Sequence, residues 1–393
     1  MTSFLDAEAP RSLRVAGLFA GVGGLELGLA SAGHQASLFC EIEPTARAVL
    51  AHHFPDIPCV ADVRELDRVP SDVDLISAGF PCQDLSQAGR TLGLAGSRSG
   101  LVGEVFRLLR GQRIPWVVLE NVPFMLQLSK GHALDVIIAT LEELGYKWAY
   151  RVIDSRSFGL PQRRHRVYIV GSLDGDPRRV LFAGNHHPPD AGNSPDETAY
   201  GFYWTEGLRG LGWATDAVPT LKGGSSLGIP SPPAIWLPTG EIVTPDIRDA
   251  ERMQGFATDW TLPAEEVARR GSRWKLVGNA VSVPVAKWIG QRLAQPKALR
   301  VSGGEPLVRK AAWPNVAWNV GEGRMTTTLS TWPVRRKSQP LVEFLRHDPA
   351  LLSERATAGF LSRAQRAKLR FPSGFLDAMN NHLELVRSHA SGT

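Results

Sequence analysis

The sequence has few cysteines and no long apolar segment. Its 393 residues include three cysteines, Cys40, Cys59 and Cys82, and none of them forms a C-x-x-C pair. Three thiols are too few for a disulfide framework, and their spacing does not suit a structural zinc site. No apolar run approaches the roughly 20 residues that a membrane-spanning helix needs, and the N-terminal segment MTSFLDAEAPRS lacks the apolar part of a signal peptide. We therefore expect a protein of the reducing cytoplasm, with no metal and no membrane contact.

The composition does not point to a fibrous, coiled-coil or disordered chain either. Apolar residues make up 43% and charged residues 21%, as in an ordinary globular protein with room for a large α/β core and a smaller module. The basic excess is uneven. Residues 297–393 hold 15 Lys and Arg against 7 Asp and Glu, which leaves 29 basic and 32 acidic side chains in residues 1–296. This C-terminal excess suits a surface that faces a polyanion, and a solvated basic tail is the alternative.

The first half of the sequence alternates short apolar runs with helical patterns. Such alternation predicts a doubly wound, mostly parallel α/β sheet of the Rossmann-like kind, which binds ligands at the carboxyl ends of its strands. The expected strands are 14–19, 36–40, 74–78, 116–120, 148–153 and 167–171. The expected helices are 23–31, 44–53, 133–144, 247–254, the later part of 275–294, and those of a helix-rich stretch at 349–388. Residues 172–243 show little periodicity, so an irregular region is expected there.

A glycine-rich turn follows the first expected strand. Gly21, Gly23 and Gly24 lie in the segment F-A-G-V-G-G, where glycine lets the chain turn tightly and lets a ligand approach main-chain N–H groups. Glu41 ends the next strand, 20 residues beyond Gly21, where nucleoside-binding α/β folds place a carboxylate on the ribose. Asp62 follows the third strand and could accept a hydrogen bond from an adenine amino group. A tight turn without a ligand is the alternative.

A cysteine lies on a turn at the same edge of the expected sheet. The strand 74–78 leads into G-F-P-C-Q, where Pro81 stiffens the turn and Cys82 follows it. An isolated cysteine is more often structural, as Cys40 would be at its strand end, but a turn after a strand favours a nucleophile. A thiolate adds readily to an electron-poor carbon and leaves again when the reaction is over.

Two further motifs carry charged groups at strand ends. Glu120 closes the apolar strand 116–120, and an acid there is costly unless it is used or satisfied. The segment Q-R-R-H-R at 162–166 precedes the last strand, and the period of an extended segment puts Arg164 and Arg166 on one face. Two guanidinium groups suit a nucleotide phosphate or a base carbonyl. A helix cap for the acid and an exposed basic patch for the arginines are the alternatives.

The motifs F-A-G-V-G-G, G-F-P-C-Q, E-N-V, Q-R-R-H-R and G-N-A-V occur in this order, and together they resemble the DNA (cytosine-5)-methyltransferases. The resemblance covers almost all of residues 12–171 and 244–294. It implies S-adenosyl-L-methionine as methyl donor and S-adenosyl-L-homocysteine as product. The cofactor-binding residues that it implies are Phe19, Gly21, Gly23, Gly24, Glu41, Ile42, Asp62, Pro81, Leu101, Asn279 and Val281.

The resemblance also implies a reaction. Cys82 would add to carbon 6 of a cytosine that is flipped out of the duplex, which activates carbon 5 for methylation. Glu120 would bind the N3/N4 edge of the base, Arg166 would hold O2, and Arg164 would support the site. The candidate DNA contacts are Ser86, Arg90 and Arg98. They lie in the stretch 83–100, which would close over DNA.

The same resemblance divides the chain. Residues 12–171 with 272–296 would form the cofactor-binding catalytic domain, and residues 172–271 a smaller, irregular target-recognition region. The family's R-E-x-x-R-x-Q-G-F segment occurs here with Asp249 in place of its Glu. The basic extension 297–393 exceeds what the core needs, so we expect it to share in DNA recognition. A structural cap is the alternative.

A chain of this kind is similar to the modification enzyme of a bacterial restriction–modification system. That implies double-stranded DNA as substrate, a cognate restriction endonuclease for the same site, a monomeric enzyme, and action on the nucleoid in the cytoplasm. An RNA methyltransferase of the same fold is one alternative, although such relatives have P-P-C where residues 80–82 are F-P-C. A non-catalytic DNA-binding regulator would not need Cys82, Glu120 and Arg166 together. An NAD-dependent dehydrogenase explains neither G-F-P-C-Q nor E-N-V.

Overall fold

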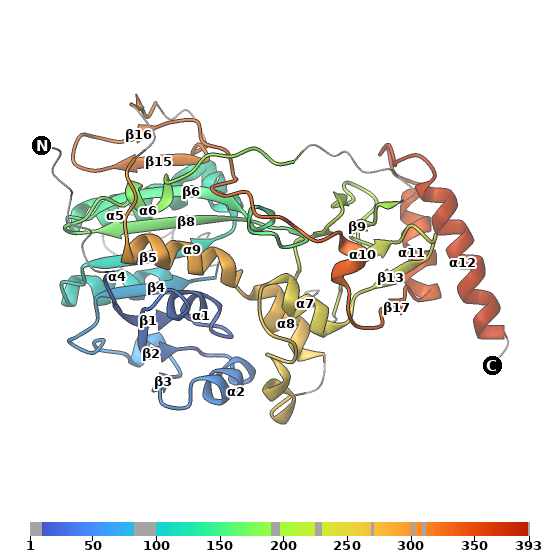
Figure 1. Ribbon diagram of the computed structural model, residues 1–393, viewed down its shortest axis with the longest axis horizontal. Helices are drawn as coiled ribbons and strands as arrows, with labels where there is room; N and C mark the ends of the chain where they lie inside the picture. Colours follow the sequence, from blue (N-terminus) through green and yellow to red (C-terminus); the bar gives the residue numbers. More distant parts are fainter. Residues whose placement is uncertain are drawn as a thin grey trace, which may run out of the picture. The chain divides into compact units, whose positions relative to one another are not determined.

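The computed structural model describes most of the chain (Figure 1). The described residues are 10–81, 100–189, 197–224, 230–268, 271–299, 303–308 and 312–391. Four residues singled out from the sequence, Cys82, Ser86, Arg90 and Arg98, lie outside them. The chain divides into two compact units. The first comprises Met1–Asp154, His165–His187 and Val281–Arg335, and the second comprises Ser155–Arg164, Pro188–Ala280 and Arg336–Thr393.

The first unit is built on a ten-stranded sheet with the order β14-β16-β15-β6-β8-β5-β4-β1-β2-β3. Its strands are β1 (Arg14–Leu18), β2 (Gln35–Cys40), β3 (Cys59–Val60), β4 (Leu75–Gly79), β5 (Trp116–Asn121), β6 (Lys147–Asp154), β8 (His165–Ser172), β14 (Glu305–Pro306), β15 (Val316–Asn319) and β16 (Met325–Thr326). The five strands from β5 to β3 pair in parallel, and the strands from β8 to β14 extend the sheet by antiparallel pairing.

Six α-helices belong to the described part of this unit. They are α1 (Gly24–Ala30), α2 (Pro44–His53), α4 (Leu101–Gly111), α5 (His132–Glu143), α6 (Arg178–Leu181) and α9 (Val283–Ala294). The strands and helices expected in residues 14–171 are present within about two residues of their expected ends. The sequence analysis does not predict helix α4. No helix in the described residues is long and apolar enough to span a bilayer.

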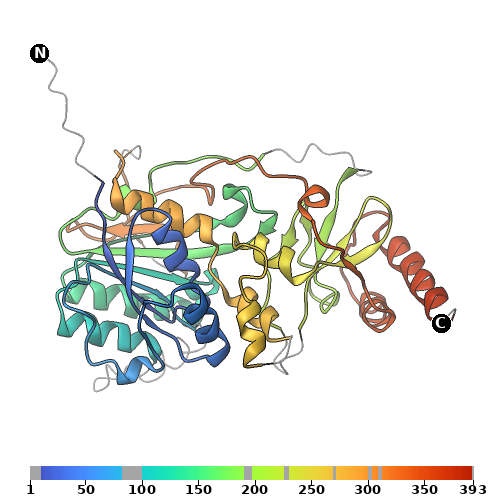
Figure 2. The same cartoon turned by 60° about the horizontal axis from the view of Figure 1, so that its bottom comes forward.

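The helices cover both faces of the sheet. Gly17 of β1 and Ser77 of β4 point to one face, where both contact Glu26 of α1. Ala16 and Ile76 precede them on the same strands and therefore point to the other face, into a core that contains the buried residues of α4 and α5. Helix α9 packs against α1, and Figure 2 shows it in orange across the sheet from the teal helices. The predicted fold class, a doubly wound Rossmann-like α/β sheet, is confirmed.

Part of the C-terminal region belongs to this sheet. Strand β15 pairs with β6 in antiparallel register, from Val316 opposite Arg151 to Asn319 opposite Trp148. Trp313 is buried and packs edge-on against Trp148 at a ring distance of 6.2 Å. The guanidinium of Arg151 is also buried and donates to the Ser330 carbonyl. These strands have two to four residues, too few for an alternating pattern that sequence analysis could detect.

The second unit contains a smaller five-stranded sheet with the order β10-β9-β12-β13-β17. Its strands are β9 (Tyr200–Phe202), β10 (Ala214–Thr215), β12 (Ala234–Trp236), β13 (Ile242–Thr244) and β17 (Ala350–Leu351), and β7 (Gln162–Arg163) pairs with β11 (Val218–Pro219). Its helices are α7 (Ile247–Met253), α8 (Ser272–Asn279), α10 (Leu341–Phe344), α11 (Glu354–Ala364) and α12 (Phe375–Ser391). Residues 336–393 therefore complete the unit that contains most of the irregular region.

Asp249 connects two segments of this unit, Pro188–Ala280 and Arg336–Thr393. Its buried carboxylate accepts hydrogen bonds from the backbone N–H groups of Arg346 and His347, at 3.0 to 3.2 Å. Arg252 also donates to it and to the Phe344 carbonyl. The residue that departs from the family pattern therefore anchors the C-terminal segment.

Candidate active site

The glycine-rich turn joins β1 to α1 in a left-handed conformation. Phe19, Gly21 and Gly23 have φ angles of 53°, 56° and 80°. Glycine adopts such angles without steric cost, whereas at Phe19 they cost free energy, as is common where a chain is shaped for function. A Cβ added at Gly21 would meet no atom within 4 Å, so the turn borders open space. A Cβ at Gly23 would lie 3.0 Å from the Phe54 ring, so that glycine also lets α2 approach.

Glu41 fastens this turn to the end of β2. One carboxylate oxygen accepts from the Gly21 N–H at 2.7 Å and the other from the Glu43 N–H at 2.8 Å. The carboxylate is thereby aimed at the turn, and each oxygen keeps a lone pair for a further donor. Ile42 follows with 62% of its surface exposed, which is unusual for a large apolar side chain beside a buried acid. The open turn, the aimed acid and the exposed Ile42 fit a nucleoside-containing cofactor.

Three other predicted cofactor residues surround the same edge. Asp62 caps a short 3-10 helix and pairs with Arg64, whose side-chain hydrogen bonds lower the pKa of the carboxyl to about 2. It is therefore an ionised acceptor at neutral pH. Leu101 begins α4 and packs on the core, and Pro81 is exposed two residues beyond β4.

Two charged residues from distant parts of the sequence meet at the carboxyl end of β5. Glu120 is nearly buried, and its Oε1 lies 3.0 Å from Nε of Arg166 in an ion pair. The antiparallel register of β5 and β8 sets Glu120 opposite Tyr168, and this brings Arg166 within reach. Glu120 also lies beside Gly79 at the end of β4 in the parallel register. An acceptor and a forked donor are thus held together next to the strand that leads to Cys82.

Sequence analysis overlooked the part played by Asn121. Its side-chain amide donates to the Phe80 carbonyl at 3.0 Å, and its Oδ1 accepts from the Val122 N–H at 2.8 Å. The motif E-N-V therefore fastens the end of β5 to the segment two residues before Cys82. The asparagine after Glu120 was the available signal, because a buried amide must find partners.

The late G-N-A-V motif contributes to both units. Val281 belongs to the first unit and is buried beside Gly79, where an added Cβ would lie 3.8 Å from its Cγ2. Asn279 belongs to the second unit, exposed at the end of α8.

Arg164 also belongs to the second unit. Its guanidinium is buried and donates to the backbone carbonyls of Leu221, Gly278 and Ala280 at 2.6 to 3.4 Å. These bonds hold the G-N-A-V segment in place, so its contacts are those of a positioning residue.

The cysteines in the described residues are poorly suited to nucleophilic chemistry. Cys40 is buried in the core, and burial raises the pKa of its thiol to about 12. Cys59 is exposed on β3, and partial burial of its sulfur raises its pKa as well. A thiol with a raised pKa supplies little thiolate near neutral pH.

Glu26 is a buried acid behind the glycine turn. Its side chain is 2% exposed, and Oε1 accepts from the Ser77 hydroxyl at 2.7 Å. Oε2 has no hydrogen-bond partner among the described residues. Burial raises the pKa of Glu26 to about 7 despite the Ser77 bond, and the charge of Glu41 raises it further. Gly17 makes room for this carboxyl, since a Cβ there would lie 2.5 Å from Oε1.

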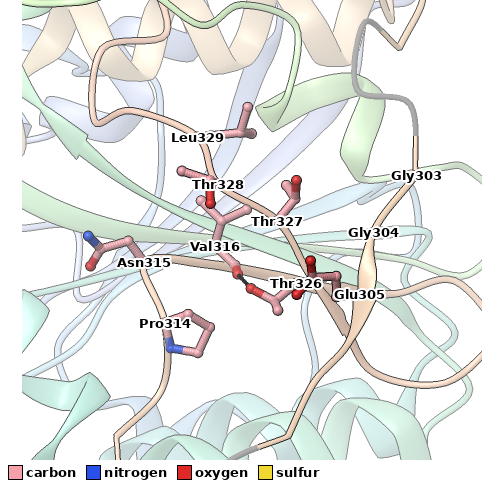
Figure 3. Close-up of a pocket in the computed structure, with 10 residues that line it drawn as sticks. All are labelled: Gly303, Gly304, Glu305, Pro314, Asn315, Val316, Thr326, Thr327, Thr328 and Leu329. Atoms are coloured by element: carbon pink, nitrogen blue, oxygen red, sulfur yellow. Dashed lines mark hydrogen bonds between the residues drawn. The ribbon is translucent and has the colours of Figure 1, made fainter.

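A separate cavity of about 570 Å³ lies at the antiparallel edge of the first sheet (Figure 3). It is lined by Gly303–Glu305, Pro314–Val316 and Thr326–Leu329. None of these residues belongs to the predicted site, and the cavity is lined by β14–β16 rather than by the strands β1 to β5 that carry the glycine turn and Glu120. Within the described residues, no group of His, Cys, Asp and Glu is arranged to hold a metal ion.

The fold and the site define an α/β protein with two features at the carboxyl ends of its strands. A glycine-rich turn suited to a nucleoside follows β1, and the ion pair of Glu120 with Arg166 lies at the end of β5. The family model described as C-5 cytosine-specific DNA methylase matches residues 13–199. The chain is 48% identical to the Type II methyltransferase M2.BsuMI of Bacillus subtilis (strain 168), over 93% of this chain and 97% of that protein. It is 30% identical to the Type II methyltransferase M.NlaX of Neisseria lactamica, over 71% and 96%.

The chain therefore belongs to the C-5 cytosine-specific DNA methylase family, and the resemblance drawn from its motifs is confirmed. Among solved structures, the crystal structure of the S. pombe Dnmt2 methyltransferase superposes with a TM-score of 0.53 at 15% identity, over 72% of this chain and 99% of that one. This likeness supports the fold alone.

Proposed function

We propose that the protein transfers a methyl group from S-adenosyl-L-methionine to carbon 5 of a flipped-out cytosine in a specific duplex DNA sequence. The observation that supports this most directly is the ion pair of Glu120 with Arg166 beside the end of β4. A carboxylate can accept from the amino group of cytosine and bind a protonated N3, while a guanidinium can donate to O2. Their direct pairing fixes the spacing of both groups before a base arrives.

The residues at the carboxyl edge of β1 and β2 would hold the cofactor. Glu41 would bind the ribose, Phe19 and Ile42 would pack on the adenine, and Asp62 would accept from its amino group. The turn would accommodate the methionine part, with Gly24 at the helix start, and Pro81, Leu101, Asn279 and Val281 would complete the pocket. When bound, this cofactor supplies an electrophilic methyl group for carbon 5 and is left as S-adenosyl-L-homocysteine.

Cys82 would act as the nucleophile. Its thiolate forms a bond to carbon 6, and the electron pair of the 5,6 double bond then makes carbon 5 reactive. Loss of the carbon 5 proton later restores the double bond and expels the thiolate. The raised pKa values of Cys40 and Cys59 leave Cys82 as the candidate, and the bond from Asn121 to Phe80 would steady the chain that leads to it.

We further propose a bacterial restriction–modification role in the cytoplasm, with a cognate endonuclease that acts on the same DNA sequence. The 48% identity with a Type II methyltransferase over nearly the whole chain supports it. Residues 12–171 with 272–296 would be the catalytic domain, and residues 172–271 with the basic 297–393 would share in DNA recognition. Ser86, Arg90 and Arg98 would contact the duplex, and the enzyme would act as a monomer.

A trapping experiment tests the chemistry. Duplex DNA with 5-fluorocytosine at the target should form a covalent adduct with the wild-type protein and cofactor, because fluorine at carbon 5 blocks the final proton loss. Cys82→Ser should form none, whereas the control Cys59→Ser should form as much as the wild type. An active enzyme that yields no adduct would rule out addition at carbon 6.

The substrate needs two further measurements. Bisulfite sequencing of DNA from cells that express the chain identifies the target sequence and the methylated cytosine. Methyl incorporation into duplex DNA and into transfer RNA then separates this function from that of an RNA methyltransferase. Incorporation into transfer RNA alone would refute a DNA substrate.

A further inference from the structure

The turn between α11 and α12 carries basic side chains without acidic ones. Residues 355–376 include Arg355, Arg363, Arg366, Lys368 and Arg370 and no Asp or Glu. Arg366, Lys368 and Arg370 are exposed. Within the described residues none of these three forms an ion pair, and the Arg366 Nε donates to the Ser362 carbonyl of its own helix. Uncompensated cations this close together repel one another, so the turn costs stability unless an anion binds there.

Arg363 joins this turn to a hairpin from the irregular region. Its Nε donates to the Glu206 carbonyl at 2.9 Å and its Nη2 to the Trp204 carbonyl at 2.6 Å. Burial and the neighbouring Arg366 lower its pKa. An added Cβ at Gly207 would lie 2.9 Å from the Phe360 ring of α11, so the hairpin and the helix are in close contact. Two segments about 160 residues apart in sequence therefore form one surface.

The tip of that hairpin is closed and projects exposed side chains. Tyr203 and Leu211 share a backbone hydrogen bond, and Gly207 donates to the Gly210 carbonyl inside it. Leu208 is 47% exposed and Arg209 is exposed at the tip. The hairpin that Arg363 holds against α11 therefore ends in one more exposed cation and an exposed apolar side chain.

An aromatic core makes the base of this surface rigid. Phe202 of β9 lies 5.6 Å from the Phe360 ring of α11 and 4.9 Å from the Phe375 ring that begins α12. The ring centres of Trp213 and Phe375 lie 5.1 Å apart. Because Phe360 and Phe375 fix the chain to the sheet on either side of the turn, the turn is presented with little conformational freedom to lose on binding.

We propose that the basic turn (residues 366–370) and the hairpin tip (residues 207–210) form one composite surface that contacts the phosphate backbone of duplex DNA. This inference rests on the proposed function and deepens it, since it assigns the DNA contact to particular residues of the C-terminal extension. The duplex is the occupant that the charge favours, because its phosphates supply the anions that the turn lacks. Such contacts set the position of the recognition unit on the duplex and carry no sequence information themselves.

The salt dependence of binding tests this surface. The triple variant Arg366→Gln/Lys368→Gln/Arg370→Gln should weaken binding equally to target and unrelated duplexes. Each lost phosphate contact should lower the slope of log K against log salt by about 0.9, so the slope should fall by roughly 2 to 3. Fluorescence anisotropy with labelled duplexes, over a range of sodium chloride concentrations, measures both quantities.

A double variant of the same helical hairpin is the control. Arg355→Gln/Arg387→Gln removes two exposed cations outside the turn, one of which, Arg387, is paired with Glu354 at 2.8 Å. It should leave the slope within about 0.5 of the wild type. Circular dichroism should be unchanged in both variants, since only exposed side chains are altered. The Tm of the triple variant should be equal to or above that of the wild type, because the repulsion within the turn is relieved.

The outcomes separate this surface from the proposed function. A triple variant with the wild-type slope and Kd, in a protein that methylates duplex DNA, overturns the surface and leaves the function intact. An equal loss of slope in the control reduces the effect to net charge and also overturns it. A wild-type protein that methylates transfer RNA and not duplex DNA refutes the function itself.

Discussion

The buried carboxyl of Glu26 should make the stability of the protein fall as the pH rises. Its pKa is raised from 4.5 to about 7 in the folded protein, chiefly by burial. An acid with a raised folded-state pKa is protonated in both states below its unfolded value, so its contribution to stability is complete there. That contribution is lost as the pH rises through the folded value, because the folded state must then hold a buried charge. Between about pH 5 and about pH 8 the loss is roughly 2 to 3 kcal/mol.

Glu26→Gln removes this titration and keeps the oxygen that accepts from Ser77. The amide cannot ionise, so the free energy of unfolding of the variant should fall by roughly 2 to 3 kcal/mol less than that of the wild type over the same range. Any constant cost of burying the amide cancels in this comparison. Equilibrium urea unfolding at about pH 5 and about pH 8, followed by circular dichroism, gives both free energies.

Glu322→Gln is the matched control, because Glu322 is exposed and the substitution is the same. It should reproduce the wild-type pH dependence. If Glu26→Gln and the wild type lose equal free energy over this range, the carboxyl is not held protonated by its surroundings and the reasoning is refuted.

Two further substitutions test contacts that hold the site and the sheet. Asn121→Ala removes the bond to the Phe80 carbonyl, so kcat should fall by roughly 10-fold to 100-fold while the cofactor Kd stays unchanged, as stopped assays and calorimetry would measure. An unchanged kcat would show that Phe80 needs no such support. Trp313→Ala should cost about 3 to 5 kcal/mol in urea unfolding, because it empties a buried site against Trp148 and Tyr150 of β6 and removes the bond to the Gly131 carbonyl. If the free energy of unfolding fell by less than about 1 kcal/mol, the packing of Trp313 would contribute little to the stability of the sheet.

Several parts of the fold could be predicted because their signals are local. Most strands of the parallel core are continuous apolar runs, and α1, α2 and α5 repeat apolar residues at helical spacing, so periodicity alone predicts them. Helix α4 has the same spacing, with Val102, Val105 and Leu109 buried, and the signal was overlooked. Helix α2 begins at Pro44, a residue suited to the first turn, and it ends where expected. The glycine turn was equally accessible, since Gly21 and Gly23 stand where the chain requires left-handed φ angles.

Other parts carried no local signal. The strands of the second unit have two or three residues, and β14 to β16 have two to four, which is too short for any period to appear. Their place in a sheet depends on backbone partners such as those of β15 on β6, about 165 residues away. Sequence analysis therefore could not divide residues 297–393 between the two units.

The sequence by itself determined the class of fold, the motifs and the residue types at each strand end, because these depend on neighbours within a few positions. Only the tertiary structure decided which of them meet. Sheet register brought Arg166 to Glu120, the fold of the second unit brought three backbone carbonyls to the guanidinium of Arg164, and the packing of α1 on the sheet buried Glu26 against Gly17 and Ser77. Such contacts depend on hydrogen-bonded pairing and burial across the whole chain, and no spacing along the sequence encodes them.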